Sequence, residues 1–215
     1  MESSIIKKLL MALSGLFLII FIAQHLFINL TSILPDNGKT FNAISHFMGY
    51  NAFVQFVLQP ILVFGVMFHF IMGFVLEFQN RKTRNQKYIV SKTRASWSSK
   101  NMIVSGLVVL SFLFLHFYDF WIPEIEYKYI SPNNPDSSRY FEELVHKFKD
   151  NVARTMIYCV SFLFLGLHLV HGFSSSLQTM GLKQKYLSMA VLASNIFSFF
   201  ITVGFVLIAV IHYFH

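Results

Sequence analysis

The sequence predicts an all-α integral membrane protein, a bundle of five transmembrane helices. Two observations lead to this fold class. Of the 215 residues, 55% are hydrophobic and only 13% are charged, and long stretches without any charge recur along the chain. A soluble domain has about 25% charged residues, so this composition cannot cover a water-facing surface. It excludes a disordered chain, a disulfide-rich secreted domain and an ordinary cytosolic enzyme.

The five predicted spans lie in a single domain that covers residues 1–215. A span needs about 20 mostly apolar residues to cross roughly 30 Å of hydrocarbon. On that criterion we place the spans at approximately 9–33, 54–78, 101–122, 153–177 and 188–212. The third reaches span length only if it continues to Trp121 and Ile122. The charge-free stretch Thr40–Leu76 is too long for one crossing, and its more polar first part predicts a surface helix or loop over 40–49.

The distribution of lysine and arginine predicts the orientation. Eleven of the 17 basic residues, but only two of the ten acidic ones, fall in the N-terminus and in the loops after the second and fourth spans. Loops rich in Lys and Arg stay in the cytoplasm. We therefore expect a multi-pass protein of the inner (cytoplasmic) membrane, with the N-terminus and the 79–100 loop inside and the 123–152 loop and C-terminus outside. Lipid contact then accounts for this chain without any nucleic-acid partner.

Nine histidines are many for a chain this apolar. Four of them are expected at the surface or tail: His46, His146, His212 and His215. The other five lie inside predicted spans, where an ionisable side chain is costly and indicates a functional site.

Four of the intramembrane histidines fall at two depths. At 1.5 Å per residue, His25 and His116 both reach a level about 24 Å from the cytoplasmic start of their spans. The second and fourth spans run in the opposite direction, which brings His69 and His168 to a common inner level. The two levels are roughly 10–12 Å apart along the helix axes. Each level thus holds two histidines from two different helices.

An internal repeat relates the first two spans to the next two. The tripeptide Ser-Gly-Leu begins at Ser14 and at Ser105, and it precedes His25 and His116 by the same interval. The serine hydroxyls either hydrogen-bond groups around a site or, as small residues, simply let the helices approach each other. A duplicated helical hairpin explains the repeat.

The second and fourth spans share the pattern His-x-x-x-Gly-Phe, with glycines Gly73 and Gly172. Residues at i and i+4 share a helix face, so each glycine is expected to leave a groove in which a flat ring can lie close to the backbone. His171, one turn after His168, is the alternative ligand of the fourth span. Only His168 keeps the spacing to glycine that His69 has.

Two imidazoles that face each other from different helices favour axial ligation of a haem. Neutral imidazole binds iron, and ligands in bundle cores project from facing helices. Two such ligands fill both axial positions, which favours electron transfer over oxygen binding. The sequence has no CxxCH attachment motif, so two non-covalent b haems are predicted in a four-helix core formed by the first four spans. The predicted iron ligands are His25, His69, His116 and His168.

These residues resemble those of a known family, the cytochrome b membrane-anchor subunits of succinate dehydrogenases and fumarate reductases, in the five-span, di-haem form. The resemblance covers nearly the whole chain, with one ligand histidine in each of the first four spans and none in the fifth. The segment from His168 to Gly181, HLVHGFSSSLQTMG, is especially similar to the fourth span of anchors from Bacteroidetes-type bacteria.

The resemblance implies a non-catalytic electron-transfer subunit of a succinate:quinone oxidoreductase. His69 and His168 would hold the haem near the cytoplasmic iron–sulfur subunit, and His25 and His116 the haem near the outer face. Electrons would pass from succinate through FAD and iron–sulfur clusters, which belong to a flavoprotein and an iron–sulfur partner subunit, and then to menaquinone. One branch of the family has a glutamate at the outer end of the second span, where this chain has Gln55 and Gln59 instead.

Haem propionates are anionic and need donors near the membrane surface. Arg154, at the outer start of the fourth span, is the candidate donor for the outer haem. The candidates at the inner side are Arg94, Lys100 and Gln178. Each of these side chains is also explained as an ordinary residue of the membrane interface.

Two alternative functions stay open at the level of the sequence. The first is a di-haem b anchor of another respiratory enzyme. This enzyme is either a quinol:fumarate reductase, which has the same wiring run in reverse, or a hydrogenase or formate dehydrogenase, which have different soluble partners. The second is a haem-free transporter or structural membrane protein, whose intramembrane histidines relay protons or join helices. The second alternative predicts a colourless protein.

Overall fold

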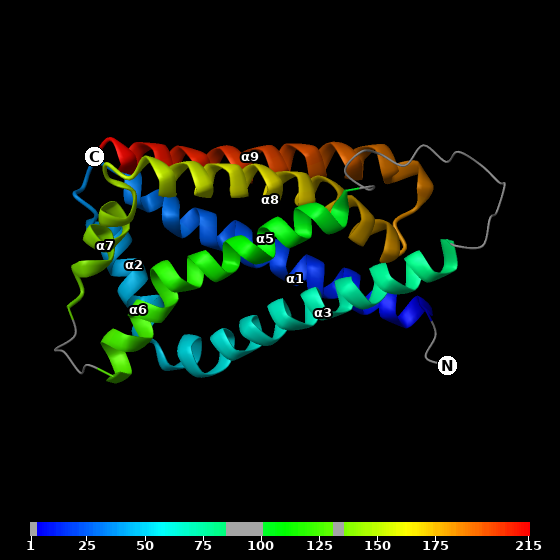
Figure 1. The fold of residues 1–215 in the computed structure, drawn as a ribbon, viewed down its shortest axis with the longest axis horizontal. Helices are drawn as coiled ribbons and strands as arrows, with labels where there is room; N and C mark the ends of the chain where they lie inside the picture. Colours follow the sequence, from blue (N-terminus) through cyan, green and yellow to red (C-terminus); the bar gives the residue numbers. More distant parts are fainter. Residues whose placement is uncertain (1–3, 85–100, 131–135) are drawn as a thin grey trace.

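The computed structural model describes residues 4–84, 101–130 and 136–215, and every regular element in these ranges is helical (Figure 1). The long helices are α1 (Ser4–Leu30), α3 (Gln59–Arg84), α5 (Met102–His116), α8 (Val152–Thr179) and α9 (Leu187–Tyr213). The shorter helices are α2 (Lys39–Tyr50), α6 (Ile122–Ile125) and α7 (Arg139–Phe148). Single turns are 3-10 at η1 (Thr31–Ile33) and η5 (Gln184–Tyr186), and π-helical at η2 (Val54–Leu58), η3 (Phe117–Trp121) and η4 (Glu126–Ile130). Arg94 and Lys100 lie outside the described residues.

Five helical segments are long and apolar enough to cross a membrane, as predicted. They are Ile5–Ile33, Val54–Lys82, Met102–Ile130, Val152–Thr179 and Gln184–Tyr213. The third differs most from the predicted span, because π-helical turns continue it beyond Ile122 to Ile130. Pro123 does not stop the helix. It lies directly after the π-helical turn η3, and local π adjustments accommodate the N–H that proline lacks in membrane helices.

Four of the long helices form a bundle around a common axis. Helix α1 packs against α3 and α8, and α5 also packs against α3 and α8. Helices α1 and α5 therefore occupy one diagonal of the bundle, and α3 and α8 occupy the other. This arrangement is the four-helix core that the first four predicted spans were expected to form.

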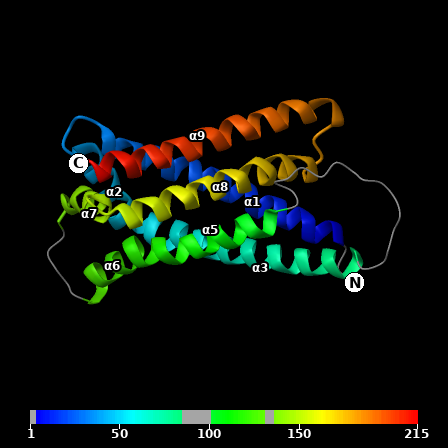
Figure 2. The same cartoon turned by 45° about the horizontal axis from the view of Figure 1, so that its top comes forward.

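The fifth long helix, α9, lies along α8 outside this bundle (Figures 1 and 2). Its buried face repeats at helical spacing and includes Ser194, Ser198, Ile201, Phe205 and Ile208. The helices approach closely at Gly166, where an added Cβ would lie 2.1 Å from Thr202 Oγ1. Small residues at such contacts let apolar helices pack without a hydrophobic driving force between them.

We expect Gly166→Ala to destabilise the α8–α9 pair. The added methyl group overlaps the Thr202 hydroxyl, and overpacking of this kind costs about 1–3 kcal/mol. The midpoint of thermal unfolding in detergent measures this effect. Thr202→Ala removes the overlapping hydroxyl, so the double variant should regain most of the lost stability, with Thr202→Ala alone as the control. A double variant as unstable as Gly166→Ala would contradict the packing argument.

Helices α2 and α7 lie together at the end of the bundle where α1 and α5 end (Figure 1). A surface helix or loop was predicted over 40–49, and the structure has a helix there, α2. It starts after Asp36, whose carboxylate accepts hydrogen bonds from the backbone N–H and the hydroxyl of Thr40, and these bonds lower the pKa of Asp36. Gly38 has φ 76°, and a side chain there would overlap Phe141 of α7. This glycine therefore lets α2 and α7 meet.

Large apolar side chains cover much of the outer surface of the long helices. Phe56 and Phe64 are 73% and 70% exposed, and Phe114 and Phe200 are similarly exposed at 68% and 65%. In a water-soluble protein such a surface would drive aggregation. The exposed apolar surface instead fits a protein whose helices face lipid.

Candidate functional site

The structure brings the four predicted ligand histidines together in two pairs across the bundle. The rings of His69 in α3 and His168 in α8 have centroids 6.2 Å apart and an interplanar angle of 73°. The rings of His25 in α1 and His116 in α5 have centroids 5.8 Å apart at 88°. Each pair therefore joins two helices on one diagonal. We call them the inner pair (His69 and His168) and the outer pair (His25 and His116).

The separation of the two rings in each pair is similar to the separation of two imidazoles that flank one metal ion. Imidazole nitrogens lie about 2 Å from a first-row metal, so two rings on opposite sides of one ion have centroids roughly 6 Å apart. The observed separations of 5.8 and 6.2 Å match this value. Within the described ranges no group of three or more His, Cys, Asp or Glu side chains could hold a metal ion.

Each histidine of the inner pair contacts a serine of the repeated Ser-Gly-Leu tripeptide. Ser14 Oγ lies 3.1 Å from His69 Nδ1, and Ser105 Oγ lies 3.4 Å from His168 Nδ1. The sequence left open whether these serines bond to neighbouring groups or only allow close packing. The structure shows the hydrogen-bond contact in both halves of the repeat.

Glycines of the two repeated motifs lie around the inner pair. A Cβ at Gly15 would lie 3.5 Å from His69 Cε1, and one at Gly106 would lie 3.6 Å from His168 Cε1. Gly73 and Gly172, which we expected to leave a groove for a flat ring, face the methyl groups of Met11 and Met102. A Cβ added at Gly73 would lie 3.6 Å from Met11 Cε, and a Cβ added at Gly172 would lie 3.5 Å from Met102 Cε. The methionines were not identified from the sequence.

His171 was the alternative ligand in the fourth span. It lies one turn beyond His168 on α8 and is half-buried. His168 is the residue of the two whose ring lies against His69. His168 is also the residue that we preferred from the sequence, because it precedes Gly172 by the same interval at which His69 precedes Gly73.

Aromatic side chains surround the outer pair. Phe21 stacks on His25 with ring centroids 5.5 Å apart. Phe112 and Phe120 flank His116 at 5.6 and 5.2 Å. The described residues supply no hydrogen-bond partner for the buried Nδ1 of His116. On the other ring, the amide nitrogen of Asn29 lies 3.4 Å from His25 Nε2.

A buried carboxylate next to the outer pair escaped the sequence analysis. Asp119, in the π-helical turn after His116, is 1% exposed. It accepts a hydrogen bond from the Tyr158 hydroxyl at 2.8 Å and forms an ion pair with Arg154 at 3.3 Å. An acidic residue within a predicted span was the signal that could have identified it. Arg154, predicted to meet a haem propionate, thus already has an acidic partner.

His212 was predicted at the surface, and this prediction is wrong. The residue is 1% exposed, and its Nε2 lies 2.9 Å from the hydroxyl of Ser32. The end of α9 is covered because α7 and η1 pack against it, and Phe141 of α7 contacts the imidazole ring. His146 and His215 are exposed as predicted, whereas His46 is half-buried against Tyr50.

A cluster of charged residues joins α2, α6, η4 and α7 at the same end of the bundle. Glu124 forms ion pairs with Lys128 and Arg139, and Lys128 also donates to the backbone oxygen of Gly49. The Tyr140 hydroxyl lies 3.4 Å from Glu124, and burial raises the pKa of Tyr140 to about 12. Its phenol therefore stays neutral and can donate to the carboxylate. This cluster holds the short helices against the third span.

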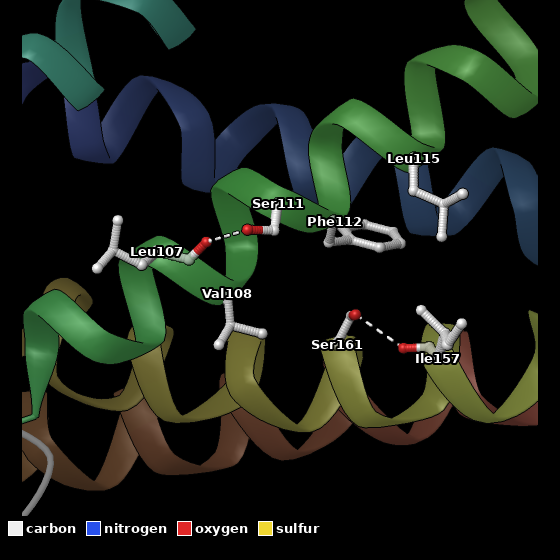
Figure 3. A pocket seen from close by; sticks show the side chains of 7 residues that line it. All are labelled: Leu107, Val108, Ser111, Phe112, Leu115, Ile157 and Ser161. Carbon is white, nitrogen blue, oxygen red and sulfur yellow. Dashed lines mark hydrogen bonds between the residues drawn. The ribbon is translucent and has the colours of Figure 1, made fainter.

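A groove of about 270 Å³ lies between α5 and α8 (Figure 3). Its wall is apolar apart from Ser111 and Ser161, whose hydroxyls donate to the backbone oxygens of Leu107 and Ile157 in their own helices. Phe112 lines the groove and also contacts His116. The groove thus presents a hydrocarbon surface close to the outer pair.

Gln178, the remaining candidate donor at the inner side, is exposed at the end of α8. No protein-family model matches the chain, and neither a curated protein nor a solved structure matches it.

Proposed function

We propose that this chain is the di-haem cytochrome b membrane anchor of a succinate:menaquinone oxidoreductase. The observation that supports the proposal is the presence of two imidazole pairs that cross the bundle at two levels, with ring separations of 5.8 and 6.2 Å. Helices that cross a membrane have little reason to bury four histidines unless a ligand uses them. Bis-histidine haem sites account for the number, pairing and spacing of these residues.

Each histidine has a distinct role in this proposal. His69 and His168 would hold one b haem near the end of the bundle where α1 begins, and His25 and His116 would hold the other near α2 and α7. A bound haem supplies a one-electron carrier at each level. Two histidines from facing helices would hold each haem, and a haem held in this way would favour electron transfer over oxygen binding. The aromatic rings around His116 exclude water from the outer site.

The charges at the two ends of the bundle support the proposed orientation. The N-terminus and the 79–100 region are rich in Lys and Arg, which favours a cytoplasmic location. The iron–sulfur subunit would dock at this end, and the flavoprotein subunit would bind to it and oxidise succinate. Electrons would then travel from the inner to the outer level and reduce menaquinone. Arg154 and Gln178 would be donors to the haem propionates.

The spectrum of the purified, partner-complete preparation tests this proposal. We expect a reduced-minus-oxidised difference spectrum of b-type haem, and pyridine haemochrome quantification of about two haems per chain. Co-purified flavoprotein and iron–sulfur subunits with succinate:quinone activity would support the whole assignment. A folded, partner-complete preparation without haem would overturn it in favour of a haem-free transporter or structural protein. One haem per chain would mean that one of the two histidine pairs has another role.

The same two pairs would suit the anchor of a quinol:fumarate reductase, a hydrogenase or a formate dehydrogenase. The soluble subunits that co-purify with the chain identify a hydrogenase or a formate dehydrogenase, whereas the preferred direction of turnover identifies a quinol:fumarate reductase. Hydrogenase or formate dehydrogenase subunits in place of the flavoprotein subunit would change the assigned enzyme but would not change the proposed haem sites.

A further inference from the structure

We propose that Ser14 and Ser105 are positioning residues that fix the tautomer of the inner histidine pair and lower the reduction potential of the haem held there. This inference rests on the proposed function, because it concerns how one of its two haem sites is tuned. The four ligand histidines alone do not explain why the Ser-Gly-Leu tripeptide occurs twice, and this inference gives its serines a role.

The direction of the two hydrogen bonds follows from the serine contacts. A hydroxyl has one hydrogen to donate and two lone pairs. Ser14 Oγ donates to the Met11 backbone oxygen at 2.9 Å, and Ser105 Oγ donates to that of Met102 at 3.0 Å. With its hydrogen on the backbone oxygen, each hydroxyl uses a lone pair toward the imidazole. In this arrangement, which we adopt, the Nδ1 atoms of His69 and His168 carry the proton.

The consequence for the ligands is a single tautomer. A neutral imidazole with its proton on Nδ1 presents an unprotonated Nε2, and this nitrogen is the one available to a metal. A partner oxygen on the far nitrogen also fixes the ring orientation and raises the basicity of the ligand. A more basic ligand stabilises the oxidised iron relative to the reduced iron. The reduction potential of the inner haem should therefore be lower than without the two hydroxyls.

The glycine that follows each serine allows this contact. Gly15 and Gly106 bring the α1 and α5 backbones next to His69 and His168, with 3.5 and 3.6 Å between an ideal Cβ and the imidazole Cε1. The same Met-x-x-Ser-Gly pattern thus makes the same contact in both halves of the repeat. The contact is therefore present in both halves of the duplicated hairpin.

In the described residues, no serine hydroxyl contacts the imidazoles of the outer pair in the way that Ser14 and Ser105 contact the inner pair. In the described part of the chain, His116 Nδ1 has no hydrogen-bond partner. The amide nitrogen of Asn29, a hydrogen-bond donor, lies 3.4 Å from His25 Nε2. The same nitrogen also donates to the His25 backbone oxygen at an N···O distance of 2.8 Å. Neither outer imidazole donates to a hydroxyl. The serines therefore make the two sites chemically different, although both have two histidine ligands.

Redox titration of the haems in the complete complex tests the inference. Ser14→Ala and Ser105→Ala should each raise the reduction potential of the inner haem. The double variant should raise it by about 59 mV, which for one electron is a tenfold change in the equilibrium constant of reduction. The potential of the outer haem should not change. Ser14→Thr and Ser105→Thr keep the hydroxyl and should keep the wild-type potential.

Ser111→Ala is the matched control. This serine lies on α5 like Ser105, but its hydroxyl donates to the Leu107 backbone oxygen in its own helix and not to a histidine. It should leave both potentials unchanged.

Several outcomes separate this inference from the proposed function. Alanine variants with two haems and unchanged potentials would overturn the role of the serines and leave the haem assignment intact. If an alanine variant loses the inner haem, the threonine variant decides: a wild-type potential supports the hydroxyl contact, and loss of haem or a shifted potential overturns it. A wild-type complex without haem would instead overturn the proposed function.

Discussion

Replacing one ligand histidine should remove one haem and leave the other. We expect His69→Ala or His168→Ala to lose the inner haem, and His25→Ala or His116→Ala to lose the outer one. Each loss would halve the haem content per chain, because a haem with one axial ligand on a single helix is no longer held across the bundle. Pyridine haemochrome quantification measures the content, and redox titration identifies which haem is left.

Two further histidine variants make this experiment decisive. His146→Ala is the matched control, since His146 is exposed on α7, far along the chain from either pair. It should retain both haems. His171→Ala should also retain both, because His168 is the ring that lies against His69. Loss of a haem in His171→Ala, with both retained in His168→Ala, would contradict our choice of ligand.

The second large effect is expected at the buried carboxylate. Asp119→Ala leaves the Tyr158 hydroxyl without its acceptor and Arg154 without its counter-ion. Removing one partner of a fully buried ion pair costs about 3–5 kcal/mol. The Arg154 side chain is 28% exposed, so water screens part of this loss, and we expect about 2 kcal/mol. That corresponds to a decrease of roughly 4–8 °C in the unfolding midpoint.

Glu126→Ala is the control for this measurement. Glu126 lies on the same continuous helix as Asp119 and is exposed, so its loss should change the midpoint little. Tyr158→Phe removes only the 2.8 Å hydrogen bond and should have an intermediate effect, because a hydrogen bond to a charged group contributes about 1.5–3 kcal/mol before screening. An Asp119→Ala variant as stable as Glu126→Ala would show that the contact between η3 and α8 through Asp119 does not stabilise the fold.

The spans and the histidine depths could be predicted because both are properties of single helices. Apolar length gives the number of long helices, and the rise per residue places a residue along its own axis. His25 and His116 were thus assigned to one level, and His69 and His168 to another, before any contact was known. The structure brings these same residues together as pairs.

The burial of His212 could not be predicted in this way. The sequence places it three residues from the C-terminus, where exposure is the usual outcome. Its burial depends on Ser32 of η1 and Phe141 of α7, which are more than 60 residues away along the chain. Chain position carries no information about such long-range covering elements.

Sequence by itself determined the five long apolar helices, the two levels of histidines and the repeat that relates the two hairpins. Tertiary structure decided which helices form each diagonal, which nitrogen of His69 faces Ser14, and that Asp119 meets Arg154 and Tyr158. The physical reason is that hydropathy and helical rise act along one axis and are local. The rotation of each helix about that axis, and hence every contact between side chains, depends on packing against all of its neighbours.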